Sequence, residues 1–411
     1  MEYGCIGEHL PHSFSKEIHE SIGSYKYELK ELRPDEIESF MLERDFKAIN
    51  VTIPYKQTVI PYLSRIDPPA ELTGAVNTIV NRGGELYGYN TDVIGLSGLI
   101  RRAGVTLKGK KTLILGTGGT SRTALAVART EGAREAIKVG RTKKDGCVTY
   151  DEAYSLHADA EIIINTTPCG MFPEPEGCPI EPERFEKLEA VFDAVYNPLE
   201  TVLVRKARRL GAKAENGLYM LASQAVAAYG IFMGVETDED LSERVYKNVL
   251  VQKENIVLTG MPGSGKTTVG RLLAGKEGRE FVDTDELIVA REKREISDIF
   301  ASDGEEYFRD VESEVIREIS MRNGLVISTG GGAILRQGNV ELLKMNGRLF
   351  FLDRPLEQLL PTEDRPLANT IEAMKKRYEE RYDKYLASAD HVIDTAGDPM
   401  DSIRQIEEKH G

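Results

Sequence analysis

The sequence predicts an α/β protein built on parallel β-sheets. Short apolar runs at residues 111–116 (KTLILG), 160–166 (AEIIINT) and 255–260 (NIVLTG) end at Gly or polar residues, as buried parallel strands do. Helix-like stretches separate such runs; residues 120–133 are one example, with Gly132 near the end. Twice along the chain a Gly-rich turn follows a strand of this kind. This alternation indicates helices layered over parallel sheets.

Composition narrows the classes of function. The 411 residues suggest two to four domains. A net charge of −14 disfavours a non-specific nucleic-acid binder, which needs a basic surface. No apolar run approaches the roughly 20 residues of a membrane helix, the first residues do not resemble a secretory signal, and the four cysteines lack metal-ligand spacing. We therefore expect a cytoplasmic protein with small-molecule partners, and no binding to nucleic acid or membranes.

The first 92 residues carry polar side chains in a series of loops. The run at residues 47–53 (KAINVTI) reads as a buried parallel strand and leads into a turn that contains Pro54. Taken singly, each loop is an ordinary turn, so only their occurrence together, in this order along the chain, indicates a functional site. The polar side chains that stand out are Ser13, Ser15, Thr52, Lys56, Asn77 and Asp92.

A dinucleotide site is predicted after the strand at residues 111–116. The turn GTGGTSR brings backbone N–H groups and a helix N-terminus onto a pyrophosphate through Gly116, Gly118, Gly119 and Thr120. The next strand, residues 136–140, ends where NAD-binding proteins place a carboxylate. Here that position holds Gly140, followed by Arg141, Thr142, Lys143 and Lys144, and these cations without a carboxylate favour a 2′-phosphate. We infer NADP(H) rather than NAD as the cofactor.

A nucleotide site is predicted in the second half of the chain. GMPGSGKT (260–267) fits the P-loop pattern and lies between an apolar strand and a helix-like segment. Its residues predict ATP binding, with Lys266 on the phosphates and Thr267 on Mg²⁺. Asp283 and Asp285 stand two apart at the end of an apolar strand, so both are expected to project from its terminus, one to hold Mg²⁺ through water and the other to accept a hydroxyl proton. The other cradle residues are Gly263, Ser264, Gly265 and Thr268.

The motifs that follow the P-loop resemble those of shikimate kinase. Four motifs occur in that family's order: DTD (283–285), GExxFRxxE (304–312), TGGG (329–332) and DRPL (364–367). The resemblance implies that Asp285 orients or deprotonates the attacking hydroxyl, and that Arg365 reaches the phosphates from a lid. It also implies a shikimate site formed by Asp285, Arg309, Gly330, Gly331, Gly332 and Arg381, in which the two arginines pair with the carboxylate. The lid sequence LLPTED is shorter and more acidic than is usual in the family.

The first half resembles shikimate dehydrogenase over about residues 1–235. The polar loops above are joined by NTTPCGM (165–171), DAVYNP (193–198) and NGLYMLASQA (216–225). The resemblance implies a catalytic pair, Lys56 and Asp92, in which Lys56 transfers the proton and Asp92 holds it. It also implies that the substrate is surrounded by Ser13, Ser15, Thr52, Asn77, Asp92 and Gln224, with Tyr196 close by.

Together the resemblances predict a bifunctional enzyme of three domains. Residues 1–94 with 219–250 are expected to bind substrate, residues 95–218 to form a Rossmann NADP domain, and residues 254–411 to form a P-loop kinase. The dehydrogenase site is expected between its two domains. The expected reactions are NADPH-dependent reduction of 3-dehydroshikimate to shikimate, and then ATP-dependent phosphorylation of shikimate to shikimate 3-phosphate.

Three alternatives stay open at the level of sequence. In the first alternative, the chain is a shikimate-sensing regulator that has lost catalysis. In the second, the first half prefers quinate or NAD. In the third, only the dehydrogenase half is active, because the kinase lid is short. The first alternative is disfavoured because the chain keeps the residues expected to act in both reactions, namely Lys56, Asp92, Lys266, Thr267 and Asp285. Comparing the four substrate–cofactor pairs decides the second.

Overall fold

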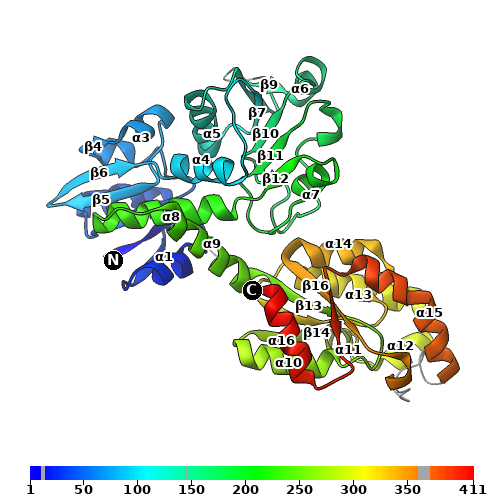
Figure 1. Ribbon diagram of the computed structural model, residues 1–411. Helices are drawn as coiled ribbons and strands as arrows, with labels where there is room; N and C mark the ends of the chain where they lie inside the picture. Colours follow the sequence, from blue (N-terminus) through cyan, green and yellow to red (C-terminus); the bar gives the residue numbers. More distant parts are fainter. Residues whose placement is uncertain (11–13, 144–145, 360–370) are drawn as a thin grey trace. The chain divides into compact units, whose positions relative to one another are not determined.

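The chain forms two compact units, residues 1–249 and 250–411 (Figure 1). The first unit contains two sheets and the second contains one. The boundary falls inside helix α9 (Glu239–Lys253), in the charged segment that precedes the P-loop strand at Asn255–Thr259. Within the described part of the chain, no helix is long and apolar enough to cross a membrane. The structure, a computed structural model, describes residues 1–10, 14–143, 146–359 and 371–411.

The first sheet mixes parallel and antiparallel strands. Its order is β2 (Tyr27–Glu31), β1 (Tyr3–Gly7), β3 (Ala48–Val51), β5 (Thr78–Arg82), β6 (Glu85–Tyr89) and β4 (Arg65–Ile66). β3 is parallel to β1 but antiparallel to β5, so the expectation of purely parallel pairing for residues 47–53 was wrong on one side. The cause is the segment between β3 and β5, which returns the chain to the edge where β3 ends, so that the N–H of Val51 donates to the carbonyl oxygen of Asn77. The two-residue turn Gly83–Gly84, with positive φ angles of 65° and 93°, then reverses the chain from β5 into β6.

Helices pack on this sheet and tie it to residues late in the unit. Helix α8 (Leu218–Met233) contacts α1 (Ser15–Ile22), α4 (Asp92–Arg102) and β5, and Figure 1 shows it running beside the sheet. Its Ala228 and Phe232 share an apolar cluster with Cys5, Tyr27 and Val80 of the strands. The helices here are α1 (Ser15–Ile22), α2 (Ile37–Glu43), α3 (Pro68–Thr73), α4 (Asp92–Arg102), α8 (Leu218–Met233) and the short η1 (Pro34–Glu36) and η2 (Ile60–Tyr62).

The second sheet is entirely parallel and buried on both faces. Along β7, Leu113 and Leu115 join one apolar cluster while Ile114 joins another, as the two-residue period of a strand requires. The strand order is β12 (Lys213–Glu215), β11 (Ala190–Asp193), β10 (Ile162–Asn165), β7 (Lys111–Leu115), β8 (Glu135–Gly140) and β9 (Val148–Thr149). Its helices are α5 (Gly119–Thr130), α6 (Tyr150–Leu156), η3 (Pro182–Arg184) and α7 (Val202–Arg209).

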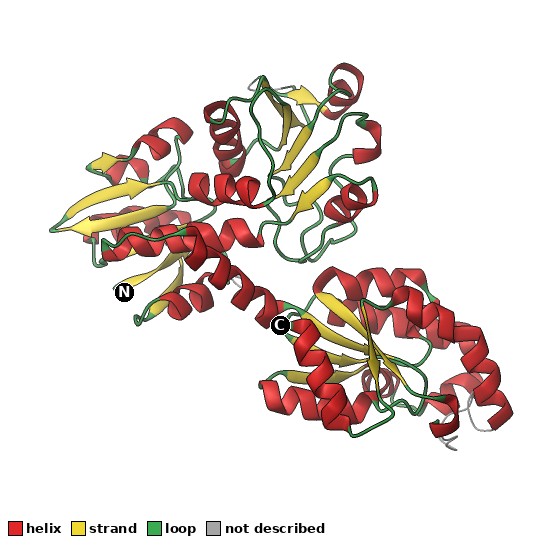
Figure 2. Ribbon diagram, viewed as in Figure 1, coloured by secondary structure: helices red, strands yellow, loops and turns green. Residues whose placement is uncertain are grey.

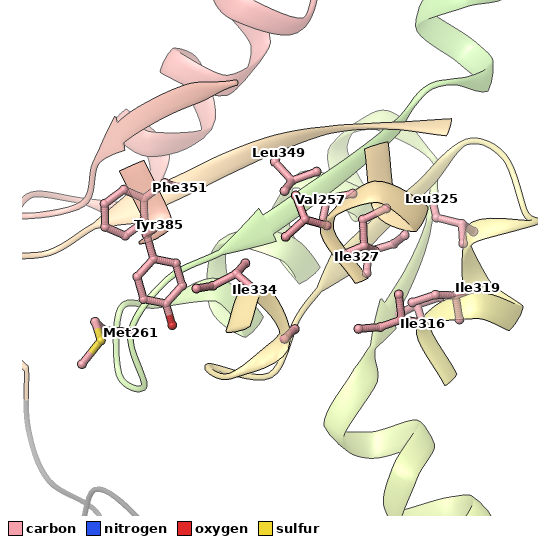
Figure 3. Packing of buried hydrophobic residues seen from close by; sticks show 14 of the residues in the cluster. Val257, Met261, Ile316, Ile319, Leu325, Ile327, Ile334, Leu349, Phe351 and Tyr385 are labelled. Atoms are coloured by element: carbon pink, nitrogen blue, oxygen red, sulfur yellow. The ribbon is translucent and has the colours of Figure 1, made fainter. Parts of the chain in front are cut away.

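The sheet of the second unit is also parallel, with helices on both faces (Figure 2). Val257 of β13 packs in the cluster drawn in Figure 3, whereas its neighbours Ile256 and Leu258 pack on the opposite face. The strand order is β14 (Glu280–Asp283), β15 (Leu325–Ser328), β13 (Asn255–Thr259), β16 (Gly347–Asp353) and β17 (His391–Asp394).

Some helices of this unit begin or end at a glycine or at a capping aspartate. Residues 299–316 form parts of two helices rather than one, because Gly304 takes a φ of 86° at the break. The helices are α10 (Lys266–Glu277), α11 (Thr284–Glu292), α12 (Ile296–Ser302), α13 (Gly304–Ser320), η4 (Ala333–Leu335), α14 (Gln337–Asn346), η5 (Leu356–Gln358), α15 (Ile371–Ser388) and α16 (Pro399–His410).

Candidate active sites

The topology of the first sheet gathers its polar loops at one edge. The turn with Thr52 and Lys56 follows β3 at its carboxyl end. β5 runs antiparallel to β3, so Asn77, just before β5, lies at that same edge. β6 reverses direction again, and Asp92 follows it at the start of α4. Loops distant in the sequence therefore meet in space.

Lys56 and Asp92 form a close ion pair at this edge. Lys56 Nζ lies 2.5 Å from Asp92 Oδ2, and the two side chains are only 16% and 10% exposed. The second carboxylate oxygen, Oδ1, accepts a hydrogen bond of 2.9 Å from Asn77 Nδ2. The carboxylate is thus held from both sides, which fixes the ammonium group of Lys56 at the surface of the site.

A buried hydrogen-bond network behind this pair was not predicted. Asn50 Nδ2 donates to the carbonyl oxygen of Asn77 (3.2 Å) and to Thr78 Oγ1 (3.1 Å), and Asn50 Oδ1 accepts from Tyr27 Oη (2.7 Å). Thr91 donates its backbone N–H to Asn77 Oδ1 (2.8 Å). The amide that holds Asp92 is therefore itself held. The available signal was Asn50, a polar residue inside an otherwise apolar run.

The network predicts that Asn50 supports the site from a distance. Replacing Asn50 with Ala removes the buried acceptor of the Tyr27 hydroxyl and one of the donors to Thr78 Oγ1, so the unfolding free energy should fall by about 1–3 kcal/mol. The measurement is the urea concentration at which dehydrogenase activity is half lost. Gln57→Ala, which removes an exposed amide from the neighbouring loop, should leave that midpoint unchanged. Equal midpoints for both variants would show that the network adds no stability.

The other expected substrate residues lie around the same edge. Gln224 on α8 is 3.2 Å from Thr91 Oγ1 through its Oε1, so it joins the group of Lys56, Asp92 and Asn77. Ser15 begins α1, directly after Phe14, whose ring packs 5.3 Å from that of Tyr196. Burial raises the pKa of Tyr196 to about 12, so its hydroxyl remains a donor at neutral pH. Thr52 is partly buried in the turn of Lys56, and Ser13 lies outside the described residues.

The carboxyl edge of the second sheet carries the predicted dinucleotide turn. Gly116 follows β7 with a φ of 115°, and a Cβ there would lie 2.7 Å from Thr166 Oγ1. Side-chain carbons at Gly118 or Gly119 would meet no described atom within 4 Å, so space lies open before α5, where Thr120 occupies the first turn. A pyrophosphate fits that space and the N–H groups of the helix end.

The basic segment after β8 is only partly available to a ligand. Arg141 and Thr142 are exposed directly after the strand. Lys143 Nζ instead pairs with Glu152 Oε1 at 2.7 Å, and this contact lowers the pKa of Glu152. Lys143 is therefore a weaker candidate for phosphate binding than Arg141. Lys144 lies outside the described residues.

The P-loop of the second unit joins β13 to α10. Gly263 and Gly265 take positive φ angles of 86° and 94°, which turn the backbone around a cradle. Lys266 Nζ rests on the carbonyl oxygens of Gly260 (2.8 Å) and Met261 (3.1 Å). Ser264 Oγ is buried without a hydrogen-bond partner among the described residues. The loop thus presents donors to a ligand, as does Thr268 in the first turn of α10.

Two acidic residues lie beside this loop in different environments. Asp283 ends β14, and its Oδ2 is 3.1 Å from Thr267 Oγ1. Asp285 is in the first turn of α11, not at the strand end with Asp283 as its spacing suggested. Its Oδ1 is buried and has no partner within the described ranges. Burial, together with the carboxylates of Asp283 and Glu312, raises the pKa of Asp285 to about 6.

Arginines and the glycine turn surround Asp285. On one face of α13, Arg309 Nη1 pairs with the fully buried Glu312 at 2.7 Å. Arg381 Nη1 donates to the carbonyl oxygen of Gly331 at 2.9 Å. A Cβ at Gly330 would lie 2.6 Å from Asp285 Oδ1, and one at Gly332 would overlap the Arg309 guanidinium. Only glycines allow this approach. Arg365 lies outside the described residues.

Tyr385 links the two loops of this site. Figure 3 shows its ring beside that of Phe351, with which it stacks at 5.0 Å. Its hydroxyl oxygen lies 3.1 Å from the carbonyl oxygen of Gly260 in the P-loop and 2.5 Å from that of Gly331 in the glycine turn. A single buried side chain thus spans the nucleotide loop and the second Gly-rich loop.

Known proteins match the first unit along its whole length. The shikimate dehydrogenase (NADP(+)) of Clostridium perfringens strain SM101 is 35% identical over 265 residues, which cover 60% of this chain and 97% of that protein. The chain belongs to the shikimate dehydrogenase family. The family's substrate-binding domain model matches residues 5–79, which include the loops of Thr52, Lys56 and Asn77.

Solved shikimate dehydrogenases share the fold of this unit. Shikimate dehydrogenase 1 from Peptoclostridium difficile is 32% identical with a TM-score of 0.56, covering 61% of this chain and 98% of its own. The shikimate 5-dehydrogenase of Thermus thermophilus, solved in complex with NADP(H) and shikimate, is 29% identical with a TM-score of 0.55 and covers 60% and 99%.

The second unit matches a different family. The shikimate kinase family model matches residues 262–409, from the P-loop to α16. The chain therefore joins a shikimate dehydrogenase to a shikimate kinase, and the two predicted family resemblances and the predicted fold class are confirmed.

Proposed function

We propose that this chain catalyses two consecutive reactions, reduction of 3-dehydroshikimate and phosphorylation of the resulting shikimate. The observation that carries the proposal is that each unit keeps the groups its reaction needs. These are the ion pair of Lys56 with Asp92 in the first unit, and the buried carboxyl group of Asp285 beside the P-loop in the second. The first reaction creates the hydroxyl group that the second consumes. The protein named as a relative acts with NADP(+), which supports the same cofactor here.

In the first reaction, Lys56 acts as the general acid. NADPH supplies the hydride that converts the 3-keto carbon to an alcohol. The ammonium group of Lys56 gives its proton to the developing oxyanion, and Asp92 holds the amine in place and stabilises its charged form. Asn77, Gln224 and the hydroxyls of Ser13, Ser15 and Thr52 bind the carboxylate and hydroxyl groups of the substrate, with Tyr196 beside them.

The open turn before α5 and the exposed Arg141 support NADP over NAD. Arg141→Gln should raise KM for NADPH roughly tenfold and leave KM for NADH unchanged, because the lost guanidinium contacts only the 2′-phosphate. Initial rates with each cofactor measure this. Arg129→Gln, an exposed arginine at the far end of α5, is the control and should change neither constant. Equal losses with both cofactors would place Arg141 on the shared pyrophosphate instead.

In the second reaction, Asp285 acts as the general base. It takes the proton of the 3-hydroxyl as that oxygen attacks the γ-phosphorus and the bond to ADP breaks. Arg309 and Arg381 hold the substrate carboxylate above Gly330, Gly331 and Gly332. Thr267 Oγ1 and Asp283 Oδ2, 3.1 Å apart, provide oxygen ligands that suit Mg²⁺, directly or through water.

One assay tests both reactions. The purified protein receives 3-dehydroshikimate, NADPH and Mg-ATP, and NADPH loss and ADP formation are followed separately. We expect both, with ADP appearing only after shikimate has formed. NADPH loss without ADP, even after shikimate is added, would restrict the activity to the dehydrogenase. No change in either signal would favour a shikimate-sensing regulator.

A further inference from the structure

Arg354 lies at the P-loop although no phosphate-binding motif contains it. The residue directly follows β16, and β16 pairs in parallel with β13, the strand that leads into the P-loop. The carboxyl ends of these neighbouring strands therefore open on the same edge of the sheet. A Cβ built at Gly265 would lie 3.9 Å from Arg354 Nη1, the one described atom within 4 Å of that point.

The backbone before Arg354 is fixed in position. The carbonyl oxygen of Asp353 accepts hydrogen bonds from Thr395 through both its backbone N–H (3.0 Å) and its Oγ1 (2.9 Å). The Asp353 carboxylate accepts a third from Tyr382 Oη at 3.0 Å. These bonds come from the residue that follows β17 and from α15, so two neighbouring segments hold the start of the Arg354 side chain beside the loop.

The guanidinium finds no partner in the described part of the chain. Arg354 Nε is buried and unbonded, and among the described residues no carboxylate or carbonyl accepts from this side chain. Buried N–H groups are almost always paired, because an unpaired one loses its hydration without compensation. Nearby, Ser264 Oγ is a second buried group of the cradle without a described partner. Both are donors, so together they indicate an anionic acceptor that binds here.

We propose that Arg354 binds the α- and β-phosphates of the nucleotide. The proposal rests on the proposed kinase function and adds a residue to it. The guanidinium fork can give two hydrogen bonds to phosphate oxygens next to the N–H groups of the P-loop. Residues 355–364 contain no Lys or Arg, so the stretch that follows Arg354 supplies no other cation before Arg365.

Calorimetric titration of the full-length protein tests this with three ligands in Mg²⁺ buffer: ADP, pyrophosphate and adenosine. Arg354→Met should weaken binding of ADP and of pyrophosphate roughly tenfold and leave adenosine unchanged. The affinity of Arg354→Lys for ADP should lie between those of the native protein and Arg354→Met. The matched control is Arg404→Met, which removes an exposed arginine paired with Asp401 on α16 and should match the native protein. Shikimate binding and the thermal unfolding midpoint should be unchanged in all variants.

Each other result counts against the proposal. Weaker adenosine binding with unchanged pyrophosphate binding would put Arg354 on the base instead of the phosphates. Unchanged ADP binding in Arg354→Met would remove any role in nucleotide binding. A lower midpoint with weaker shikimate binding in both Arg354 variants would make the residue structural. If the native protein binds shikimate but neither ADP nor pyrophosphate, the proposed kinase function itself fails, and the role of Arg354 fails with it.

Discussion

Replacing Lys56 with Met should lower the rate of shikimate-dependent NADP⁺ reduction roughly 10²–10⁴-fold, the usual contribution of a positioned general acid or base. The physical reason is that Lys56 Nζ, held 2.5 Å from Asp92 Oδ2, moves the proton of the 3-oxygen: it gives the proton in the reduction and accepts it in this reverse direction. KM for shikimate should change much less than kcat, because hydroxyl and amide groups carry most of the binding.

The second unit provides an internal control for this variant. Kinase activity with added shikimate, measured on the same protein sample, should be unchanged in Lys56→Met. Lys26→Met removes an exposed lysine from the same sheet region and should keep full dehydrogenase activity. If Lys56→Met retained more than a tenth of the native rate, Lys56 would not be the proton donor, and the ion pair would be structural.

Replacing Asp285 with Asn should lower kcat/KM of the kinase by a similar factor, roughly 10²–10⁴-fold. The pH dependence of kcat/KM tests the same role of Asp285 independently. Because the pKa of Asp285 is raised to about 6, the carboxyl group becomes neutral as the pH falls through that value and can no longer accept a proton. Native kcat/KM should therefore fall about tenfold per pH unit below about pH 6, and stay level above it, since this ratio reports groups of the free enzyme.

The residual activity of Asp285→Asn should lack that acid limb. Asp298→Asn, at an exposed position on α12, should keep both the native rate and the native profile. A native profile that stays flat to pH 5 would contradict a carboxylate base with a raised pKa. An acid limb that persists in Asp285→Asn would assign it to another group.

Local patterns predicted much of the fold, for a physical reason. Strands such as β7 and β13 are buried on both faces, so their apolar runs are continuous and easy to recognise. Both Gly-rich turns follow such strands. The antiparallel pairing of β3 with β5 was not predicted, because it depends on how residues 52–77 return the chain to the edge where β3 ends, and nothing within residues 47–53 reports it.

The residues of the candidate sites also divide into those that local sequence predicts and those that depend on distant parts of the chain. Residues with a distinctive local motif, such as Lys266, were predicted from the motif alone. Asn50 and Arg354 were not, because what distinguishes them is a contact with a residue far along the chain. The raised pKa of Asp285 likewise depends on burial and on Glu312, which a different helix supplies. Such features exist only once the sheet has brought its loops to one edge.

The hydroxyl of Tyr385 has a consequence for how the kinase responds to its two ligands. A phenol carries one proton, so it can donate to Gly260 or to Gly331, but not to both at once. A ligand that displaces one loop changes which carbonyl is satisfied, and so changes the free energy of the other loop. We therefore expect occupancy of one binding site to alter the affinity of the other, and thermodynamic reciprocity requires the effect to be equal in both directions.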